Sequence, residues 1–301
     1  MPAPAAPVAK TPQQVIEEFL ALQSIERRDE HLKTLSELPE GLEAVTVLDL
    51  SRSGVTDTGM SYLPKFPALD EIDLSETRIS NSGMTAVGQV PTLRKIVLRA
   101  VQQVDNTGIQ ALTKLEKLEE LTLATLPISD GVMESIKEMK GLRRLNISGN
   151  RTLLGMEFSN LVSKGHFESL EELNVSQTQF GFYGLKQMNK LKNLQILVAM
   201  QCEIADGLVT GLGGCESLRI LNVGQNKLTD EGIKGINRMK KLEELNLSGN
   251  LITDKAVVQF KTMKQLKSLN LDATGVTAAE AGELKTKSLT DTVIIAEGKT
   301  L

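Results

Sequence analysis

The sequence predicts an α/β fold, a solenoid (horseshoe) with a concave parallel β-sheet and short helices on its convex side. The main observation is a phrase that returns about every 24 residues, a Leu-x-x-Leu-x-Leu run followed by Thr or Asn and then by Ile-Thr-Asp-x-Gly-Leu. A fixed period in this range is the signature of stacked repeats. The chain is 41% apolar but only 3% aromatic, which agrees with an aliphatic core of repeated slots. About ten repeats, called coils below, begin at the apolar anchors Val45, Leu69, Leu93, Leu118, Leu142, Leu170, Leu194, Leu218, Leu242 and Leu266.

The segment before the first coil predicts a leader and a cap. Residues 1–10 are rich in Pro and Ala, lack the layout of a signal peptide, and are expected to form a flexible leader. Thr11, Pro12 and Gln14 form a strong helix start, with an N-cap, a proline at the first helical position and a capping box. We therefore expect a helical N-terminal cap over 11–41, which would cover the apolar edge of the first coil.

Each coil of the solenoid, which spans 42–288, contains a strand and a helix. In the Leu-x-x-Leu-x-Leu run the fourth and sixth positions point inward, and the third and fifth point outward. Thr-Asp then offers N-cap oxygens, and Met60, Leu63 and Phe66 recur at a helical spacing in the first coil. The third coil has one extra residue, and the fifth is 28 residues long, with a longer convex connection over 150–169. Over 289–301 we expect a closing strand near Val293 and a polar tail that blunts the sheet edge.

These motifs resemble leucine-rich repeat proteins of the 24-residue bacterial kind, with the pattern LxxLxLxxTxITDxGLxxLxxLxx, over about 245 of the 301 residues. The resemblance implies a curved solenoid that binds proteins, or less often other ligands, on its concave sheet. The ninth position departs from the plainest pattern at Val101 and Leu126, which have no hydrogen-bonding group. Backbone groups beside these two must find other partners. The other ladder residues are Asn150, Asn226 and Asn250, or the hydroxyls of Thr77, Thr178 and Thr274.

The outward positions of the strands alternate in charge from coil to coil. Opposite charges on adjacent strands attract, so this pattern is expected to help fix the stacking register. It also removes the continuous basic stripe that nucleic-acid binding would need. The second position runs Asp70, Arg94, Glu119, Arg143, Glu171, Gln195, Arg219, Glu243 and Lys267, and the third runs Glu71, Lys95, Glu120, Arg144, Glu172, Ile196, Ile220 and Glu244. The fifth position is mostly Asn, at Asn146, Asn174, Asn222, Asn246 and Asn270, and these side chains are expected to hydrogen-bond one another.

Both patterns fail in the seventh coil. Ile196, Val198 and Met200 are outward there, and Ile220 follows on the next coil; we call these four residues the apolar patch. Grouped apolar residues on a polar face usually mark a contact site. The alternatives are that curvature or a loop covers them, or that they have no function. Charged neighbours are expected to orient a partner, namely Arg144, Glu172, Arg219 and Glu244. A weaker candidate comprises Val97, Ala100, Thr122 and Ala124 beside Arg94, Lys95 and Arg99.

No segment predicts catalysis or a cofactor. Neither His31 nor His166 belongs to a cluster with metal-ligand spacing, and Cys202 and Cys215 are predicted to be buried thiols. No glycine-rich phosphate loop is present. The recurring aspartates are interpreted as helix N-caps, at Asp57, Asp130, Asp206, Asp230 and Asp254.

The sequence thus predicts a non-enzymatic scaffold that recognises a protein partner on the concave sheet. The alternative is a structural or cell-envelope protein that self-associates or binds glycans. No apolar stretch is long enough for a transmembrane helix. The localisation stays open: extracytoplasmic if the leader follows a removed signal, and otherwise cytoplasmic.

Overall fold

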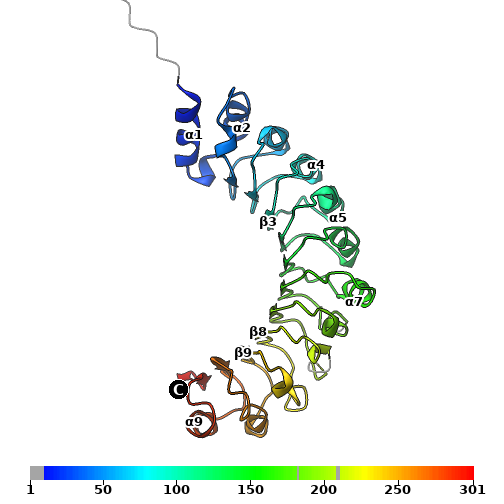
Figure 1. The fold of residues 1–301 in the computed structure, drawn as a ribbon, viewed down its shortest axis with the longest axis vertical. Helices are drawn as coiled ribbons and strands as arrows, with labels where there is room; N and C mark the ends of the chain where they lie inside the picture. Colours follow the sequence, from blue (N-terminus) through cyan, green and yellow to red (C-terminus); the bar gives the residue numbers. More distant parts are fainter. Residues whose placement is uncertain (1–9, 182, 208–210) are drawn as a thin grey trace, which may run out of the picture. The chain divides into compact units, whose positions relative to one another are not determined.

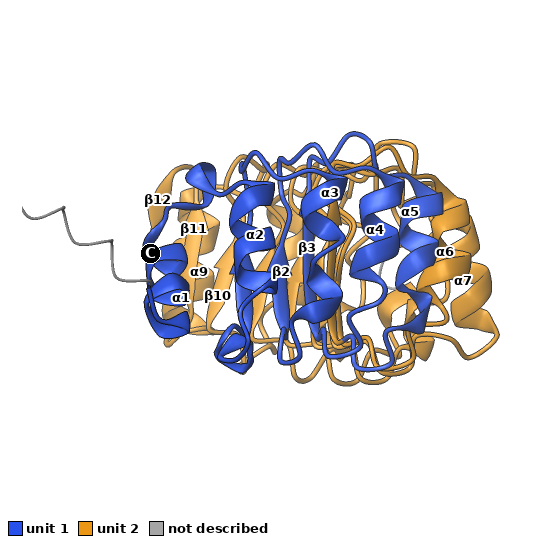
Figure 2. Cartoon of the chain, turned by 90° about the horizontal axis from the view of Figure 1, so that it is seen from above, with its two compact units in different colours: residues 1–118 blue, residues 119–301 orange. Residues whose placement is uncertain are grey.

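The computed structural model describes residues 10–181, 183–207 and 211–301, so residues 1–9 of the expected leader lie outside the described residues. The chain divides into two compact units, residues 1–118 and 119–301 (Figure 2). In each unit, successive coils place a short strand on one side and a helix or helical turn on the other (Figure 1). The predicted α/β solenoid is therefore confirmed.

Unit 1 contains a parallel sheet in which β2 pairs with both β1 and β3. Its strands are β1 (Val47–Asp49), β2 (Glu71–Asp73) and β3 (Lys95–Arg99). Its α-helices are α1 (Pro12–Ala21), α2 (Asp29–Ser36), α3 (Asp57–Met60), α4 (Asn81–Val87) and α5 (Asn106–Gln110). Its 3-10 turns are η1 (Ser24–Glu26), η2 (Leu42–Ala44), η3 (Leu63–Lys65) and η4 (Ala111–Lys114).

The first helix begins as the sequence predicts. The Thr11 hydroxyl accepts a hydrogen bond from the Gln14 N–H, and the Gln14 side chain accepts one from the Thr11 N–H. Arg27, which follows η1, is buried and donates to the Asp49 carbonyl at 2.5 Å and to the Leu22 carbonyl at 3.0 Å. An arginine from the segment before the first coil thus satisfies a carbonyl of β1.

Unit 2 contains a longer sheet in which each strand from β4 to β11 pairs in parallel with the next. Its strands are β4 (Glu120–Ala124), β5 (Arg144–Asn146), β6 (Glu172–Asn174), β7 (Ile196–Val198), β8 (Ile220–Asn222), β9 (Glu244–Asn246), β10 (Ser268–Asn270), β11 (Val293–Ala296) and β12 (Lys299–Thr300). Among its described residues the α-helices are α6 (Met133–Ile136), α7 (Met156–Ser163) and α9 (Ala278–Lys287). Its 3-10 turns are η5 (Asp130–Val132), η6 (Met188–Lys190), η7 (Ile236–Arg238) and η8 (Asp254–Gln259).

The core consists of the inward leucines of the repeat, stacked in register. Leu145, Leu173, Leu197 and Leu221 are paired partners on successive strands, and each is at most 2% exposed. Burying such a side chain contributes roughly 1.5–3 kcal/mol relative to exposure. The long fifth coil contains α7 over part of the expected connection, and Gly155 precedes it with φ of 75°.

The C-terminal tail forms a strand of its own. Glu297 and Gly298 have positive φ and make a two-residue turn, after which β12 pairs antiparallel with β11. The sequence predicted only that polar side chains of the tail would blunt the sheet edge. In the structure the tail backbone also hydrogen-bonds to the closing strand, β11.

The recurring aspartates are not the N-caps that the sequence analysis expected. Asp57 is the first residue of α3, whose N-cap is Thr56. The Asp57 carboxylate instead accepts the N–H and the hydroxyl of Ser80, the N-cap of the next coil, at 2.8 and 2.5 Å. The same contact joins Asp206 to Thr229, Asp230 to Thr253 and Asp254 to Thr277, while Asp130 accepts three backbone N–H groups, those of Leu154, Gly155 and Met156. We call this series the aspartate ladder.

The ninth-position residues form a second, buried ladder. The Asn226 Oδ1 accepts the N–H groups of Cys202 and Ile204 from the preceding coil, and its Nδ2 donates to the Ala199 carbonyl. Where Leu126 breaks the pattern, its N–H donates to the Asn150 Oδ1 of the following coil at 2.7 Å. The expected need for another partner is thus met at Leu126.

Candidate binding surface

The strand register of unit 2 brings five of the eight predicted site residues into one row on the outward face of the sheet. They are partners on successive strands in the order Arg144, Glu172, Ile196, Ile220 and Glu244. We call this the third-position row. It is set by the repeat alone, since each residue occupies the third position of its coil.

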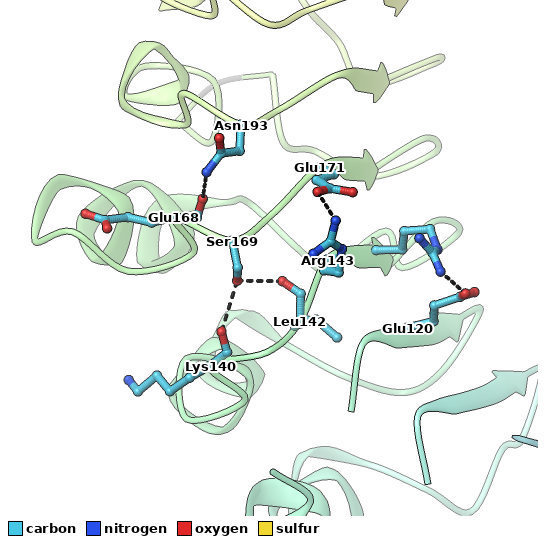
Figure 3. Close-up of polar contacts among 9 residues, drawn as sticks. Glu120, Lys140, Leu142, Arg143, Glu168, Ser169, Glu171 and Asn193 are labelled. Atoms are coloured by element: carbon cyan, nitrogen blue, oxygen red, sulfur yellow. Dashed lines mark hydrogen bonds and ion pairs between the residues drawn. The ribbon is translucent and has the colours of Figure 1, made fainter. Parts of the chain in front are cut away.

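Ion pairs link most of the charged outward residues of neighbouring coils. Arg144 donates to Glu120, which raises the pKa of the Arg144 guanidinium. Figure 3 shows a pair in the second-position column, in which Arg143 donates to Glu171 of the following coil. These contacts match the predicted charge alternation. The close-up also shows contacts between coils outside the strands. Ser169 donates to the carbonyls of Lys140 and Leu142, and Asn193 donates to the carbonyl of Glu168.

A second charged cluster lies beside the C-terminal end of the row. Arg219 donates to both carboxylate oxygens of Glu243, at 3.1 and 3.0 Å, and Lys267 lies 2.7 Å from the same carboxylate. The hydrogen bonds from Arg219 and then from Lys267 lower the pKa of Glu243 to about 2. Arg219, a predicted orienting residue, is therefore already engaged by its neighbour.

The apolar patch lies on β7, on β8 and in the turn after β7. All four of its side chains are half-buried, neither covered completely nor fully exposed. In five of the ten coils a fifth-position Asn Oδ1 accepts the N–H two residues later, as Asn174 does from Ser176 at 3.0 Å. Val198 has no such acceptor, and the Met200 N–H donates instead to the Ser176 hydroxyl of the preceding coil at 3.2 Å.

This geometry corrects the prediction for the asparagine column. The Oδ1 atoms bind the turn that follows each strand, not the neighbouring asparagine. The bonds run from Ser148 to Asn146, Ser176 to Asn174, Gly224 to Asn222, Ser248 to Asn246 and Asp272 to Asn270. The column is therefore explained by turn formation, whereas Val198 is not.

A groove of about 260 Å³ opens on the same face, across β4 to β7. One wall consists of third-position residues and the other of fifth-position residues, with inward leucines contributing to the floor. Its lining includes Glu120, Arg144, Glu172 and Ile196 on one side and Thr122, Asn146, Asn174 and Val198 on the other. Four predicted site residues thus line one groove, which was not predicted from the sequence.

A polar pocket of about 450 Å³, which the sequence did not predict, lies beyond the ends of the strands. Gln177, Gln201 and Gln225 occupy the eighth position of three successive coils, each with positive φ. The Gln177 Nε2 donates to the Gln201 Oε1 at 2.9 Å. Three glutamines in register at one position were a signal in the sequence that could have identified this pocket.

The weaker predicted candidate is divided by the boundary between the units. Val97 and Ala100 belong to unit 1, and Thr122 and Ala124 belong to unit 2. Ala124 is only 1% exposed, so it is not the outward contact residue that the sequence suggested.

The cysteines are buried, as predicted. Burial raises the pKa of Cys202, and it raises that of Cys215 to about 12, so both thiols are protonated at neutral pH.

Of the two histidines, His31 accepts the Arg28 N–H at the start of α2, and His166 lies beside Phe167. Among the described residues no group of three or more His, Cys, Asp or Glu side chains could hold a metal ion. No helix within those same residues is both long and apolar enough to cross a membrane.

Comparison by sequence identifies the repeat but no individual relative. Two family models match, both described as leucine-rich repeat, one over residues 216–276 and the other over 40–63. No curated protein matches the chain.

Comparison of structures agrees with the repeat assignment. An internalin, InlF, from Listeria monocytogenes has 18% identity and a TM-score of 0.64, with 89% of this chain and 76% of that chain covered. A leucine-rich repeat protein from Leptospira interrogans has 18% identity and a TM-score of 0.54, with 88% and 74% covered. A chain of the octameric complex of Latrophilin 3, Unc5D and FLRT2, in which FLRT2 contributes a leucine-rich repeat, has 18% identity and a TM-score of 0.58, with 88% and 87% covered. At these identities the likeness concerns the fold.

Proposed function

The chain is a leucine-rich repeat protein, and from this premise we propose that it is a non-enzymatic scaffold that binds a protein partner on the concave sheet of unit 2. The proposed contact is centred on the apolar patch and oriented by its charged neighbours. Its residues are Ile196, Val198, Met200, Ile220, Arg144, Glu172, Arg219 and Glu244. The fold supports this class of function, because a solenoid offers an extended surface instead of a closed pocket.

The observation that most supports this location is the exchange of asparagine for Val198. The exchange removes a turn acceptor, and Ser176 supplies a replacement from the neighbouring coil. Local folding therefore does not account for a β-branched apolar residue there. An apolar contact with a partner does, because grouped apolar side chains on a polar face usually mark an interaction site.

The groove supports the same location. At about 260 Å³ it has room for one or two partner side chains, with Ile196 and Val198 at its apolar end and Glu172 beside them. A side chain that fills such a groove would be desolvated, as the residues that dominate protein interfaces are.

A pull-down tests this proposal with the double variant Val198→Asp, Met200→Asp as bait in an extract of the native host. We expect recovery of the partner to fall at least tenfold, because two carboxylates would be buried at the contact. Val47→Asp is the matched control, since Val47 is an apolar outward residue on β1 of unit 1 and is 50% exposed. Unchanged recovery with the patch variant, when circular dichroism matches the wild type, would contradict the assignment.

The alternative function, glycan binding or self-association, is favoured by one feature, the polar pocket. Its amide side chains from Gln177, Gln201 and Gln225 can donate to and accept from sugar hydroxyls. A glycan array with the wild type and Gln201→Ala tests this alternative, and light scattering tests self-association. Binding that depends on Gln201 and not on Val198 would favour the alternative over protein recognition.

A further inference from the structure

The two carboxylates that flank the apolar patch are the residues from which the partner's chemistry can be inferred. Along the third-position row, Glu172 pairs with Ile196, Ile196 with Ile220, and Ile220 with Glu244. Two isoleucines therefore lie between two glutamates. The partner inferred below rests on the proposed function, because it occupies the same surface.

These two glutamates differ from their neighbours in how their charge is balanced. Glu120, Glu171 and Glu243 each lie in an ion pair with an arginine. Among the described residues neither Glu172 nor Glu244 lies within ion-pair distance of a cation. The arginines beside them form their hydrogen bonds elsewhere, Arg144 with Glu120 and Arg219 with Glu243, and they attract Glu172 and Glu244 only through longer-range charge interactions.

The spacing of the two carboxylates selects a backbone conformation for the partner. Three strand intervals separate Glu172 from Glu244, so their Cα atoms lie roughly 14 Å apart at about 4.8 Å per interval. An extended chain rises about 3.4 Å per residue and presents every second side chain to one face. Residues four apart in an extended segment therefore match both the distance and the face.

A helical partner segment matches the spacing of Glu172 and Glu244 less well than an extended one. At 1.5 Å per residue, a helix needs about nine residues to cover roughly 14 Å. Residues nine apart on a helix point to opposite faces, because each residue turns the helix by about 100°. The extended segment is therefore favoured.

We propose that the partner is an extended peptide segment with two basic residues four positions apart and an apolar residue midway between them, a Lys/Arg-x-Φ-x-Lys/Arg pattern in which Φ is apolar. The basic side chains pair with Glu172 and Glu244, and the apolar residue packs on Ile196 and Ile220. Opposite charge makes each flanking contact favourable, and like charge at the same places would repel.

A phage-displayed library of random 12-residue peptides, selected on the immobilised full chain, tests this inference. We expect enrichment of the basic-apolar-basic pattern, and a synthetic peptide of the consensus should bind at least tenfold more weakly to the Glu172→Gln, Glu244→Gln variant. The charge-reversed Glu172→Lys, Glu244→Lys variant should select acidic residues at the same two positions. Glu71→Gln is the matched control, since Glu71 is a third-position glutamate of unit 1 that pairs with Lys95 at 3.1 Å, and it should leave peptide affinity unchanged.

The outcomes separate this inference from the function on which it rests. Selected peptides that lose binding to Ile196→Asp, Ile220→Asp, but show no enrichment of basic residues, would overturn the inferred chemistry and leave the binding surface standing. If no selected peptide lost binding to the Ile196→Asp, Ile220→Asp variant, both the inferred partner chemistry and the assignment of the apolar patch would be overturned.

Discussion

The contact between Asp57 and Ser80 explains at the residue scale why the repeat contains Asp-x-Gly. The carboxylate of one coil reaches the N-cap of the next, and the glycine of that next coil lies directly beside it. A Cβ placed on Gly83 would lie 2.5 Å from the Asp57 Oδ1. The same approach recurs at Gly59, Gly108 and Gly232, where the side-chain oxygens of Asp29 in α2, Asn81 and Asp206 would be 2.3 to 2.4 Å away. The glycine is therefore required by the aspartate ladder, and not by its own backbone conformation.

We predict that Gly83→Ala destabilises unit 1 by about 2–4 kcal/mol. The added methyl group displaces the Asp57 carboxylate from two hydrogen bonds and crowds the helix, and each lost charge-assisted bond costs roughly 1.5–3 kcal/mol when it is not replaced by water. Denaturant unfolding followed by circular dichroism measures the change. In the Asp57→Ala background, the additional cost of Gly83→Ala should fall below about 1 kcal/mol, because the nearest clashing atom is gone.

Gly282→Ala is the matched control for this prediction. Gly282 lies inside α9, and a Cβ there would meet nothing within 4 Å. The substitution should raise stability by about 0.5–1 kcal/mol through helix propensity. If both substitutions gave the same change, or if the cost at Gly83 persisted without Asp57, close approach to the ladder would not be the reason for the glycine.

The aspartate ladder also shows what the sequence could and could not predict. The period alone predicted the strands, the inward leucines and the buried thiols, because each follows from position within one coil. The role of Asp57 depends on its distance to Ser80, which lies one coil further along the chain. The half-burial of Val198 and the replacement of its turn acceptor by Ser176 depend on neighbouring coils in the same way.

At the scale of the strands, charge pairs between coils set a pH dependence. The pKa of Glu243 is lowered to about 2 by Arg219 and Lys267, whereas the ordinary value is 4.5. A group whose folded pKa is below its unfolded value stabilises the fold above the unfolded pKa, and that contribution disappears as the pH falls through the folded pKa. The contribution of Glu243 should therefore be complete above pH 4.5 and lost between about pH 4.5 and 2.

We predict that Glu243→Gln lowers the unfolding midpoint in denaturant at pH 7 but has a diminishing effect as the pH falls toward 2. The difference between wild type and variant should also shrink in 1 M salt, because Glu243 is solvent-accessible and its pairs are screened. Glu40→Gln, which removes an exposed carboxylate that forms no ion pair with another described residue, controls for the general response to acid. A difference that stayed constant from pH 7 to pH 2 would mean that the charge of Glu243 does not contribute.

For the whole molecule, a solenoid leaves an open sheet edge wherever the stacking stops. A strand edge with unpaired N–H and C=O groups is a template for pairing with another chain. In this protein β12 lies on that edge: it pairs with Ile295 and Ala296, and the Leu301 N–H donates to the Ile294 carbonyl at 2.8 Å. The Gly298 N–H also binds the Asp272 carboxylate at 2.6 Å, which ties the hairpin turn to the tenth coil.

We predict that removal of residues 297–301 makes the protein self-associate. The deletion uncovers the backbone of β11, and edge-to-edge pairing then becomes available to a second copy. Light scattering coupled to size-exclusion chromatography should show a larger mass for the truncated chain than for the full chain, with the difference increasing with concentration. The double variant Lys299→Ala, Thr300→Ala is the matched control, because both side chains are exposed and the backbone pairing of β12 is kept. It should retain the mass of the full chain, and a truncated chain with that same mass would show that β12 does not protect the edge.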